Sequence, residues 1–135
     1  MKKILVTGAK GQLAQCIKDA SAELPADAFQ FIFMDRSQLD ISDSEVVEAY
    51  FFSNPVDCVI NCAAYTAVDK AESDVEKAFK VNADAVKTLA KETKDAGADF
   101  IHISTDYVFN GEGNVPFTED QMTSPVSVYG KSKLE

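Results

Sequence analysis

Four short apolar runs alternate along this chain with segments whose apolar residues recur at helical spacing, and this alternation constrains the fold most. The runs are KKILVT, FQFIFMD, DCVIN and DFIHIST, at residues 2–7, 29–35, 57–61 and 99–105. Short apolar runs rich in β-branched and aromatic residues are typical of parallel strands buried on both faces. Strands that alternate with helices predict an α/β fold in which a doubly wound parallel sheet carries helices on both faces.

Helical segments are expected between these runs and after the last of them. The expected ranges are 11–24, 41–53, 71–97 and 124–135. Two of these segments carry the S-x-x-E spacing of a capping box, in which serine and glutamate side chains bond the free N–H groups of a first helical turn. The pairs are Ser42 with Glu45 and Ser73 with Glu76.

The last predicted helix follows a long loop at residues 106–123. Ser124 before Pro125 predicts the start of that helix, because serine caps well and proline suits the first helical position. A loop of this length in a compact α/β domain is usually functional. It also leaves the carboxyl end of a strand, where open α/β sheets bind ligands. The sequence therefore predicts a binding site at this edge.

The charge balance excludes some classes of partner. The chain has 22 acidic and 13 basic residues, with a net charge of −9. A domain without a basic stripe gains nothing from releasing phosphate counterions, so no nucleic-acid partner is expected. No apolar run approaches the roughly 20 residues of a membrane span, so no membrane partner is expected either. The length of 135 residues predicts one domain over 1–135.

The three cysteines, Cys16, Cys58 and Cys62, are odd in number. The last two lie in a run that reads as a buried strand entering a turn, which favours reduced core thiols over a metal pair. We therefore expect no metal site. The N-terminal MKKILVTGAKG has two lysines and an apolar run of only about four residues, against roughly 7–15 in a signal peptide, so it is interpreted as a first strand and a cytoplasmic location is expected.

A glycine-rich turn, TGAKGQLA, joins the first predicted strand to the first predicted helix. Gly8 can adopt the positive φ of a tight turn, and Gly11 allows a ligand to approach the backbone. The helix that follows directs its free N–H groups and its positive dipole end toward the turn, which suits a pyrophosphate. Ala14 stands where the usual fingerprint has a third glycine. This context predicts dinucleotide binding in a Rossmann-type fold.

The last residue of the second predicted strand and the residue that follows it bear on the choice of dinucleotide. Asp35 is placed to accept a hydrogen bond from a ribose 2′-hydroxyl, which favours NAD. Arg36 could instead hold the 2′-phosphate of NADP, or it could be an ordinary solvated arginine. The sequence leaves the preference between NADH and NADPH open.

A phenol and an ammonium, Tyr129 and Lys133, are four residues apart on the last predicted helix, so they share one face. An ammonium beside a phenol stabilises the phenolate and suits the pair to general acid–base chemistry at a carbonyl or hydroxyl. A hydroxyl at Ser104 or Thr105, at the exit of the fourth strand, could bond the reacting oxygen. Spacing does not decide between these two hydroxyls.

Four motifs together resemble one enzyme family. In chain order they are TGAKGQLA, NCAAYTAVDKAE, STDYVFNGEG and SPVSVYGKSKLE. They resemble the extended short-chain dehydrogenases/reductases, and more narrowly the members that reduce a dTDP-linked 4-keto sugar to dTDP-L-rhamnose with NADPH or NADH. The resemblance implies an NAD(P)-dependent oxidoreductase with a nucleotide-sugar substrate.

The resemblance also implies roles for individual positions. Thr105 matches the catalytic hydroxyl, Tyr129 the proton donor, and Lys133 the lysine that assists the tyrosine and binds the nicotinamide ribose. Thr105, Asp106 and Tyr129 would contact the substrate. The implied cofactor contacts are Gly8, Gly11, Gln12, Leu13, Asp35, Arg36, Asp40, Ile41, Ala63, Ala64, Tyr65, Thr66 and Lys133.

Two alternatives stay open. A sugar-nucleotide epimerase or dehydratase of the same fold is one, because dehydratases carry an acid beside the active hydroxyl, where this chain has Asp106. The other is a non-catalytic, nucleotide-binding regulatory subunit. A pure binder has no need of Thr105, Tyr129 and Lys133 together, which argues against the second alternative.

Members of the family are longer and contain a C-terminal part that supplies most of the sugar-nucleotide pocket. We therefore expect residues 1–135 to be the cofactor domain, truncated before the substrate domain. By itself this chain would bind a dinucleotide weakly and would not turn over. The resemblance admits a homodimer of the full-length form.

Overall fold

The structure is a computed structural model that describes all 135 residues. The chain divides into two compact units. The first unit contains residues 1–64 and 85–103, and the second unit contains residues 65–84 and 104–135.

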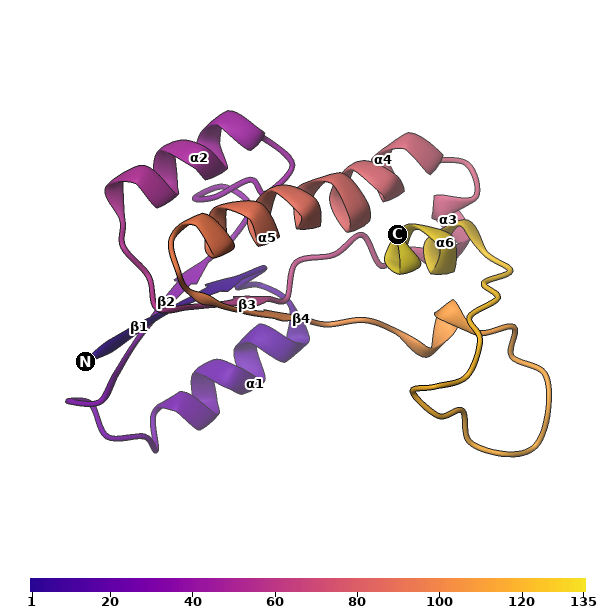
Figure 1. Cartoon of the computed structure of the whole chain (residues 1–135), viewed down its shortest axis with the longest axis horizontal. Helices are drawn as coiled ribbons and strands as arrows, with labels where there is room; N and C mark the ends of the chain where they lie inside the picture. The colour runs from indigo at the N-terminus through magenta and orange to yellow at the C-terminus, as the bar shows by residue number, and fades with distance from the viewer. The chain divides into compact units, whose positions relative to one another are not determined.

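The first unit is built on a four-stranded parallel sheet (Figure 1). Its strands are β1 (Lys2–Thr7), β2 (Phe29–Met34), β3 (Cys58–Asn61) and β4 (Asp99–His102), in the order β2-β1-β3-β4. Because β2 and β3 lie on opposite sides of β1, the chain reverses its direction of winding there. The predicted parallel sheet is confirmed. The fourth strand is shorter than expected, since its pairing with β3 ends at His102.

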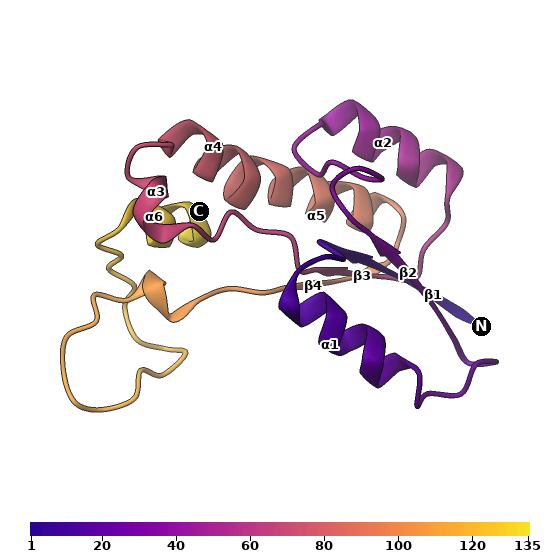
Figure 2. The ribbon, with the colours of Figure 1, turned by 180° about the vertical axis from the view of Figure 1, so that it is seen from behind.

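Helices cover both faces of this sheet. Helix α1 (Gln12–Ser21) lies on one face, and α2 (Ser44–Ser53) and α5 (Ala85–Asp95) lie on the other, as the two opposite views show (Figures 1 and 2). The core between the layers consists of fully buried apolar side chains, namely Leu5, Val6, Ala14, Val47, Val59 and Leu89. Burial of these side chains is the main force that holds strands and helices together. The predicted doubly wound arrangement is confirmed.

The second unit consists mainly of short helical segments. They are α3 (Val68–Ala71), α4 (Val75–Phe79), the π-helical turn η1 (Lys80–Asp84), the 3₁₀ turn η2 (Asp106–Val108) and α6 (Val128–Leu134). A small core of Ala71, Ala78 and Tyr129 holds the unit together, and Val68 and Val128 pack against it. None of the helices in the chain is both long and apolar enough to cross a membrane.

Both predicted capping boxes are wrong. Helix α2 is capped by Asp43, whose carboxylate accepts from the backbone N–H of Val46 at 3.2 Å. Ser42 lies one residue before this cap, and its hydroxyl donates to Asp40 at 2.6 Å. Ser73 donates its hydroxyl to the carbonyl of Lys70, so it closes the previous turn and α4 begins only at Val75.

The predicted helix over 71–97 is also wrong as a single element. The chain forms α3, a break at 72–74, α4, and then the π-helical turn that precedes α5. The last helix begins later than expected, at Val128, and its cap is Ser127, which accepts from the N–H of Gly130 at 3.0 Å. Ser124 instead uses its own N–H to bond the carbonyl of Val108 at 2.9 Å.

Candidate functional site

The turn after β1 requires glycine at its first position. Gly8 has a φ of +67°, in the left-handed region that side chains with a Cβ avoid. A Cβ at Gly8 would also lie 2.7 Å from the backbone nitrogen of Ala63 and 2.8 Å from its Cα. The exits of β1 and β3 therefore pass in direct contact at the point where the winding of the sheet reverses. Ligands of open α/β sheets bind at such a point.

Helix α1 leaves its N-terminus free for an anion. Its N-cap is Gly11, no side chain caps it, and its first turn contains no acid. The first N–H groups and the positive end of the helix dipole are thus uncompensated by side chains, and Gly8 and Gly11 place no Cβ in front of them. Gln12 and Leu13, in the first turn, are exposed. This cradle fits a dinucleotide pyrophosphate.

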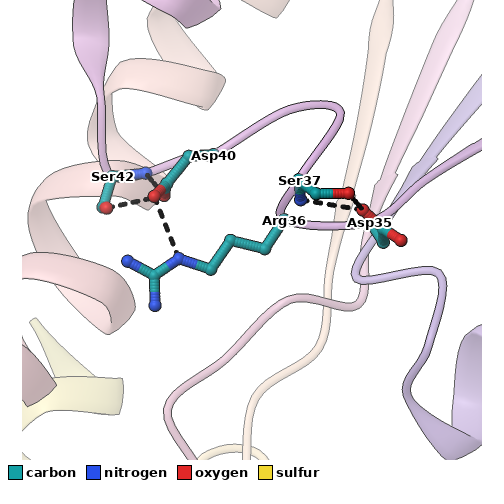
Figure 3. Close-up of polar contacts among 5 residues, drawn as sticks. All are labelled: Asp35, Arg36, Ser37, Asp40 and Ser42. Atoms are coloured by element: carbon teal, nitrogen blue, oxygen red, sulfur yellow. Dashed lines mark hydrogen bonds and ion pairs between the residues drawn. The ribbon is translucent and has the colours of Figure 1, made fainter.

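Asp35, directly after β2, is already bound on both carboxylate oxygens. One oxygen accepts from the N–H and the hydroxyl of Ser37, at 2.8 and 2.6 Å (Figure 3). The other lies 2.6 Å from the ammonium of Lys10, which projects from the glycine turn. The hydrogen bond from Lys10, followed by those from Ser37, holds the pKa of Asp35 well below its usual range. Asp35 is therefore ionised, and Lys10 neutralises it.

Arg36 and Asp40 form a second pair in the same loop. Arg36 donates from Nε to Asp40 at 2.9 Å, and the two remaining guanidinium nitrogens point away from Asp40 (Figure 3). Burial raises the pKa of Asp40, while hydrogen bonds from Ser42 and Arg36 lower it, and the net direction is downward. Ile41, next to Asp40, is buried. The exits of β1 and β2 thus present two cations, Lys10 after β1 and Arg36 after β2, each bound to an acid.

A row of polar side chains crosses the carboxyl ends of three strands, and sequence reasoning missed it. Asn61 at the end of β3 accepts from the hydroxyl of Thr7 on β1 at 2.6 Å and lies 3.1 Å from Nδ1 of His102 on β4. The same Asn61 oxygen accepts from the N–H of Ala63 at 3.2 Å. This bond fixes the segment that contacts Gly8, with Ala64 next in the chain. The sequence feature that could have predicted this row is an asparagine at the end of an apolar strand.

In the second unit, the two residues of the predicted proton-transfer pair lie on α6 and are both buried. Tyr129 is 9% exposed and Lys133 is 8% exposed, although long charged side chains are seldom buried. Burial lowers the pKa of the Lys133 ammonium, because the charged form is costly in a low-dielectric environment. A buried lysine one turn from a buried tyrosine is unusual for a structural helix and typical of a reactive site.

Thr105 and Asp106 lie at the start of η2, beside a cavity of about 810 Å³. The hydroxyl of Thr105 caps η2 by accepting from the N–H of Tyr107 at 3.2 Å, and it donates to Asp106 at 3.3 Å. Thr105, Asp106 and Lys133 all line the cavity, together with Phe109 and Phe117, but Tyr129 does not. The structure therefore brings two of the three predicted catalytic residues, Thr105 and Lys133, to one cavity with the predicted substrate contact Asp106.

Asn82, in the π-helical turn, is a buried hydrogen-bonding centre that sequence reasoning also missed. Its oxygen accepts from the N–H of Tyr65 at 2.8 Å, and its amide donates to the carbonyl of Tyr65 and to the hydroxyl of Ser132, both at 3.0 Å. Ser132 in turn donates to the carbonyl of Tyr129 at 2.8 Å. The π-helical turn thus ties α6 to Tyr65 within the second unit. The sequence feature that could have predicted this centre is a polar residue on the apolar face of a predicted helix.

Tyr65 and Thr66, predicted to line the cofactor, differ in their surroundings. The hydroxyl of Tyr65 donates to Asp74 at 3.1 Å, and the ring packs against the core of the second unit. Its side chain is therefore engaged within the protein, whereas Thr66 is exposed. Their roles toward a cofactor stay predictions.

Comparison with known proteins gives a consistent result. The family described as RmlD substrate binding domain matches residues 1–135. A dTDP-4-dehydrorhamnose reductase from Sinorhizobium fredii is 41% identical over 133 residues, which are 98% of this chain and 44% of that protein.

Solved structures agree. A dTDP-4-dehydrorhamnose reductase from Clostridium acetobutylicum has a TM-score of 0.92 and 43% identity, over 98% of this chain and 46% of that one. Another, from Bacillus anthracis in complex with NADP, has a TM-score of 0.92 and 33% identity, over 99% of this chain and 47% of that one. The chain thus spans about half the length of these relatives.

Proposed function

This chain belongs to the RmlD substrate-binding-domain family, and we propose that it is the part of an NAD(P)H-dependent dTDP-4-dehydrorhamnose reductase that holds the dinucleotide and the proton-transfer residues. The proposed reaction reduces the C4 ketone of dTDP-4-dehydrorhamnose to the hydroxyl of dTDP-L-rhamnose. Two relatives support it: the one from Sinorhizobium fredii is a dTDP-4-dehydrorhamnose reductase, and the one from Bacillus anthracis was solved in complex with NADP.

The first unit supplies the dinucleotide contacts in this proposal. The uncapped N-terminus of α1 and the absence of side chains at Gly8 and Gly11 suit the pyrophosphate. Asp35 suits the 2′-hydroxyl of NADH, and Lys10 and Arg36 suit the 2′-phosphate of NADPH. When bound, the reduced nicotinamide supplies the hydride.

The second unit supplies the proton. Tyr129 donates its hydroxyl proton to the oxygen that becomes negative as the ketone is reduced, and a general acid of this kind accelerates such a step about 10²- to 10⁴-fold. Lys133 stabilises the resulting phenolate by its positive charge. Thr105 donates a hydrogen bond that orients the ketone oxygen. In the structure the same hydroxyl donates to the exposed acid Asp106.

The observation that carries the proposal is the burial of Tyr129 and Lys133 together on α6. Burying a lysine costs stability, and a helix that serves only as structure has no reason to bear that cost. A general acid assisted by a cation does have one.

The experiment uses the complete protein that carries this chain, with dTDP-4-dehydrorhamnose and NADPH or NADH. We expect consumption of the reduced cofactor in equal amount to the dTDP-L-rhamnose formed, measured by absorbance and by chromatography of the nucleotide sugars. Conversion of a nucleotide sugar without net consumption of cofactor would favour the epimerase or dehydratase alternative. Tight cofactor binding without any conversion would favour a regulatory subunit.

The cations near Asp35 predict an effect on cofactor choice. Lys10→Gln is expected to weaken NADPH binding about 10-fold more than NADH binding, because it removes a charge-assisted bond to the 2′-phosphate and leaves Asp35 to repel that group. Titration calorimetry with both cofactors measures this ratio. Lys18→Gln, in the last turn of α1, is the matched control and should change neither affinity. Equal loss for both cofactors would contradict the role of Lys10.

We also propose a cytoplasmic location, which the absence of disulfides among Cys16, Cys58 and Cys62 supports. A homodimer of the full-length form, and the lack of a nucleic-acid partner, stay predictions.

A further inference from the structure

The backbones of turn η2 and helix α6 approach each other so closely that the residue of α6 at the point of contact cannot carry a side chain. A Cβ at Gly130 would overlap the carbonyl oxygen of Tyr107 and would lie 3.1 Å from the Cβ of Pro125. Gly130 is buried in the middle of the first turn of α6, where alanine would normally be the more stable residue by about 1 kcal/mol. The glycine is therefore explained by this contact and not by helix formation.

The residue on the other side of this contact, Tyr107, also touches the proposed reactive groups. Its ring meets the ring of Tyr129 edge to face, with centroids 5.5 Å apart and an interplanar angle of 75°. Its N–H donates to the hydroxyl of Thr105 at 3.2 Å. Tyr107 thus contacts Thr105 through its N–H, Gly130 through its carbonyl and Tyr129 through its ring.

A further bond holds the two segments together. The N–H of Ser124 donates to the carbonyl of Val108, the last residue of η2, at 2.9 Å. It fixes the segment that enters α6. The side chain of Tyr107, by contrast, is 48% exposed, so little of its area contributes to the core.

We propose that Tyr107 and Gly130 are positioning residues that hold the Thr105 hydroxyl and the Tyr129 phenol in one fixed arrangement. The inference rests on the proposed function, in which Thr105 orients the ketone oxygen and Tyr129 protonates it. The two residues lie on separate segments joined by the long loop, which leaves their relative position free unless a contact sets it. Catalytic groups must be held within about 0.5 Å of the productive geometry. The backbone contact at Gly130 and the ring contact at Tyr129 provide that restraint.

The test uses four variants of the complete protein. Gly130→Ala adds a methyl group that forces the backbone contact with Tyr107 apart, and Tyr107→Ala removes the ring contact with Tyr129. Tyr107→Phe keeps the ring, and Lys131→Ala is an exposed control on the same helix. We expect kcat to fall about 10- to 100-fold in the first two, since a displacement of about 1 Å can cost 10²-fold. KM and cofactor affinity should stay within about 3-fold of wild type, and Tyr107→Phe and Lys131→Ala should retain wild-type kcat.

Tyr107→Ala keeps the test decisive if Gly130→Ala fails to fold, because the side chain that it removes is half exposed. Thermal unfolding of each variant identifies a folding failure. Wild-type kcat in Tyr107→Ala would overturn the proposal. Equal losses in Tyr107→Phe and Tyr107→Ala would also overturn it, since they would assign the effect to the hydroxyl and not to the ring.

A second readout separates this inference from the proposed function. Amide hydrogen exchange of residues 105–108 and 129–133 should become faster in Gly130→Ala than in wild type, whether or not the protein reduces the keto sugar. Inactive wild-type protein would refute the proposed function alone. Unchanged exchange in a folded Gly130→Ala variant would refute the restraint itself.

Discussion

Replacing Tyr129 by phenylalanine in the complete protein is expected to lower turnover of dTDP-4-dehydrorhamnose by about 10²- to 10⁴-fold, the usual contribution of a general acid. The substitution removes the proton donor and keeps the ring. The edge-to-face contact with Tyr107 and the packing on Ala71 and Ala78 should therefore persist. Steady-state kinetics with NADPH measure the loss, and fluorescence titration should show nearly unchanged cofactor affinity.

The control for this experiment is Tyr50→Phe, which removes a phenol hydroxyl from α2 in the first unit. It should leave turnover unchanged. Near-normal reduction of the keto sugar by Tyr129→Phe would refute the assigned role of the phenol. Loss of cofactor affinity in parallel with turnover would instead show that Tyr129 acts in binding.

Gly8→Ala is expected to destabilise the protein by about 2–5 kcal/mol. About 1–2 kcal/mol comes from placing alanine in the left-handed region, and about 1–3 kcal/mol comes from overpacking against Ala63. The distortion would move the turn in front of α1, so dinucleotide binding should be lost as well. Urea denaturation measures the free energy of unfolding, and calorimetry measures binding.

Gly97→Ala is the matched control, because it separates the two causes. Gly97 has a φ of +68°, close to the +67° of Gly8, but a Cβ there would have no atom within 4 Å. Gly97→Ala should lower the free energy of unfolding only by the cost of the left-handed conformation, about 1–2 kcal/mol. It should leave dinucleotide binding intact. Equal destabilisation by the two substitutions would mean that the contact between Gly8 and Ala63 contributes nothing.

The sheet could be predicted closely from the sequence. The bounds of β1 match the expected run at 2–7, and β2 and β3 match within one residue. The reason is local, since short β-branched and aromatic runs bounded by turn residues have few alternatives to a buried strand. The fourth strand was overestimated because β3, its partner, ends at Asn61, which pairs with His102.

Helix starts were predicted less well, because several residues of a capping type stand close together at each start and only one of them takes the N-cap position. Ser42, Ser73 and Ser124 are all of a residue type that caps helices, yet the N-cap positions fall at Asp43, Asp74 and Ser127. Spacing alone gives no measure of this competition.

The residues of the candidate site also fall into those that the sequence named and those that it did not. The glycine turn, Asp35 and the pair on α6 were named from the sequence, because each is a local pattern with a local physical reason. Their functional roles stay predictions until the substitutions are measured. Asn61, Asn82, Lys10 and Tyr107 were not named, since each acts through a partner that is distant in the sequence, as Asn82 does through Ser132.

The sequence by itself therefore determined the first three strands, the glycine turn after β1 and the placement of Tyr129 and Lys133 on one helix, because periodicity, glycine geometry and residue chemistry are local properties. Only the tertiary structure decided which oxygens of Asp35 are occupied, how Asn82 ties α6 to Tyr65, and why position 130 must be glycine. These depend on hydrogen bonds and close contacts between segments that no sequence period relates, and folding alone brings such segments together.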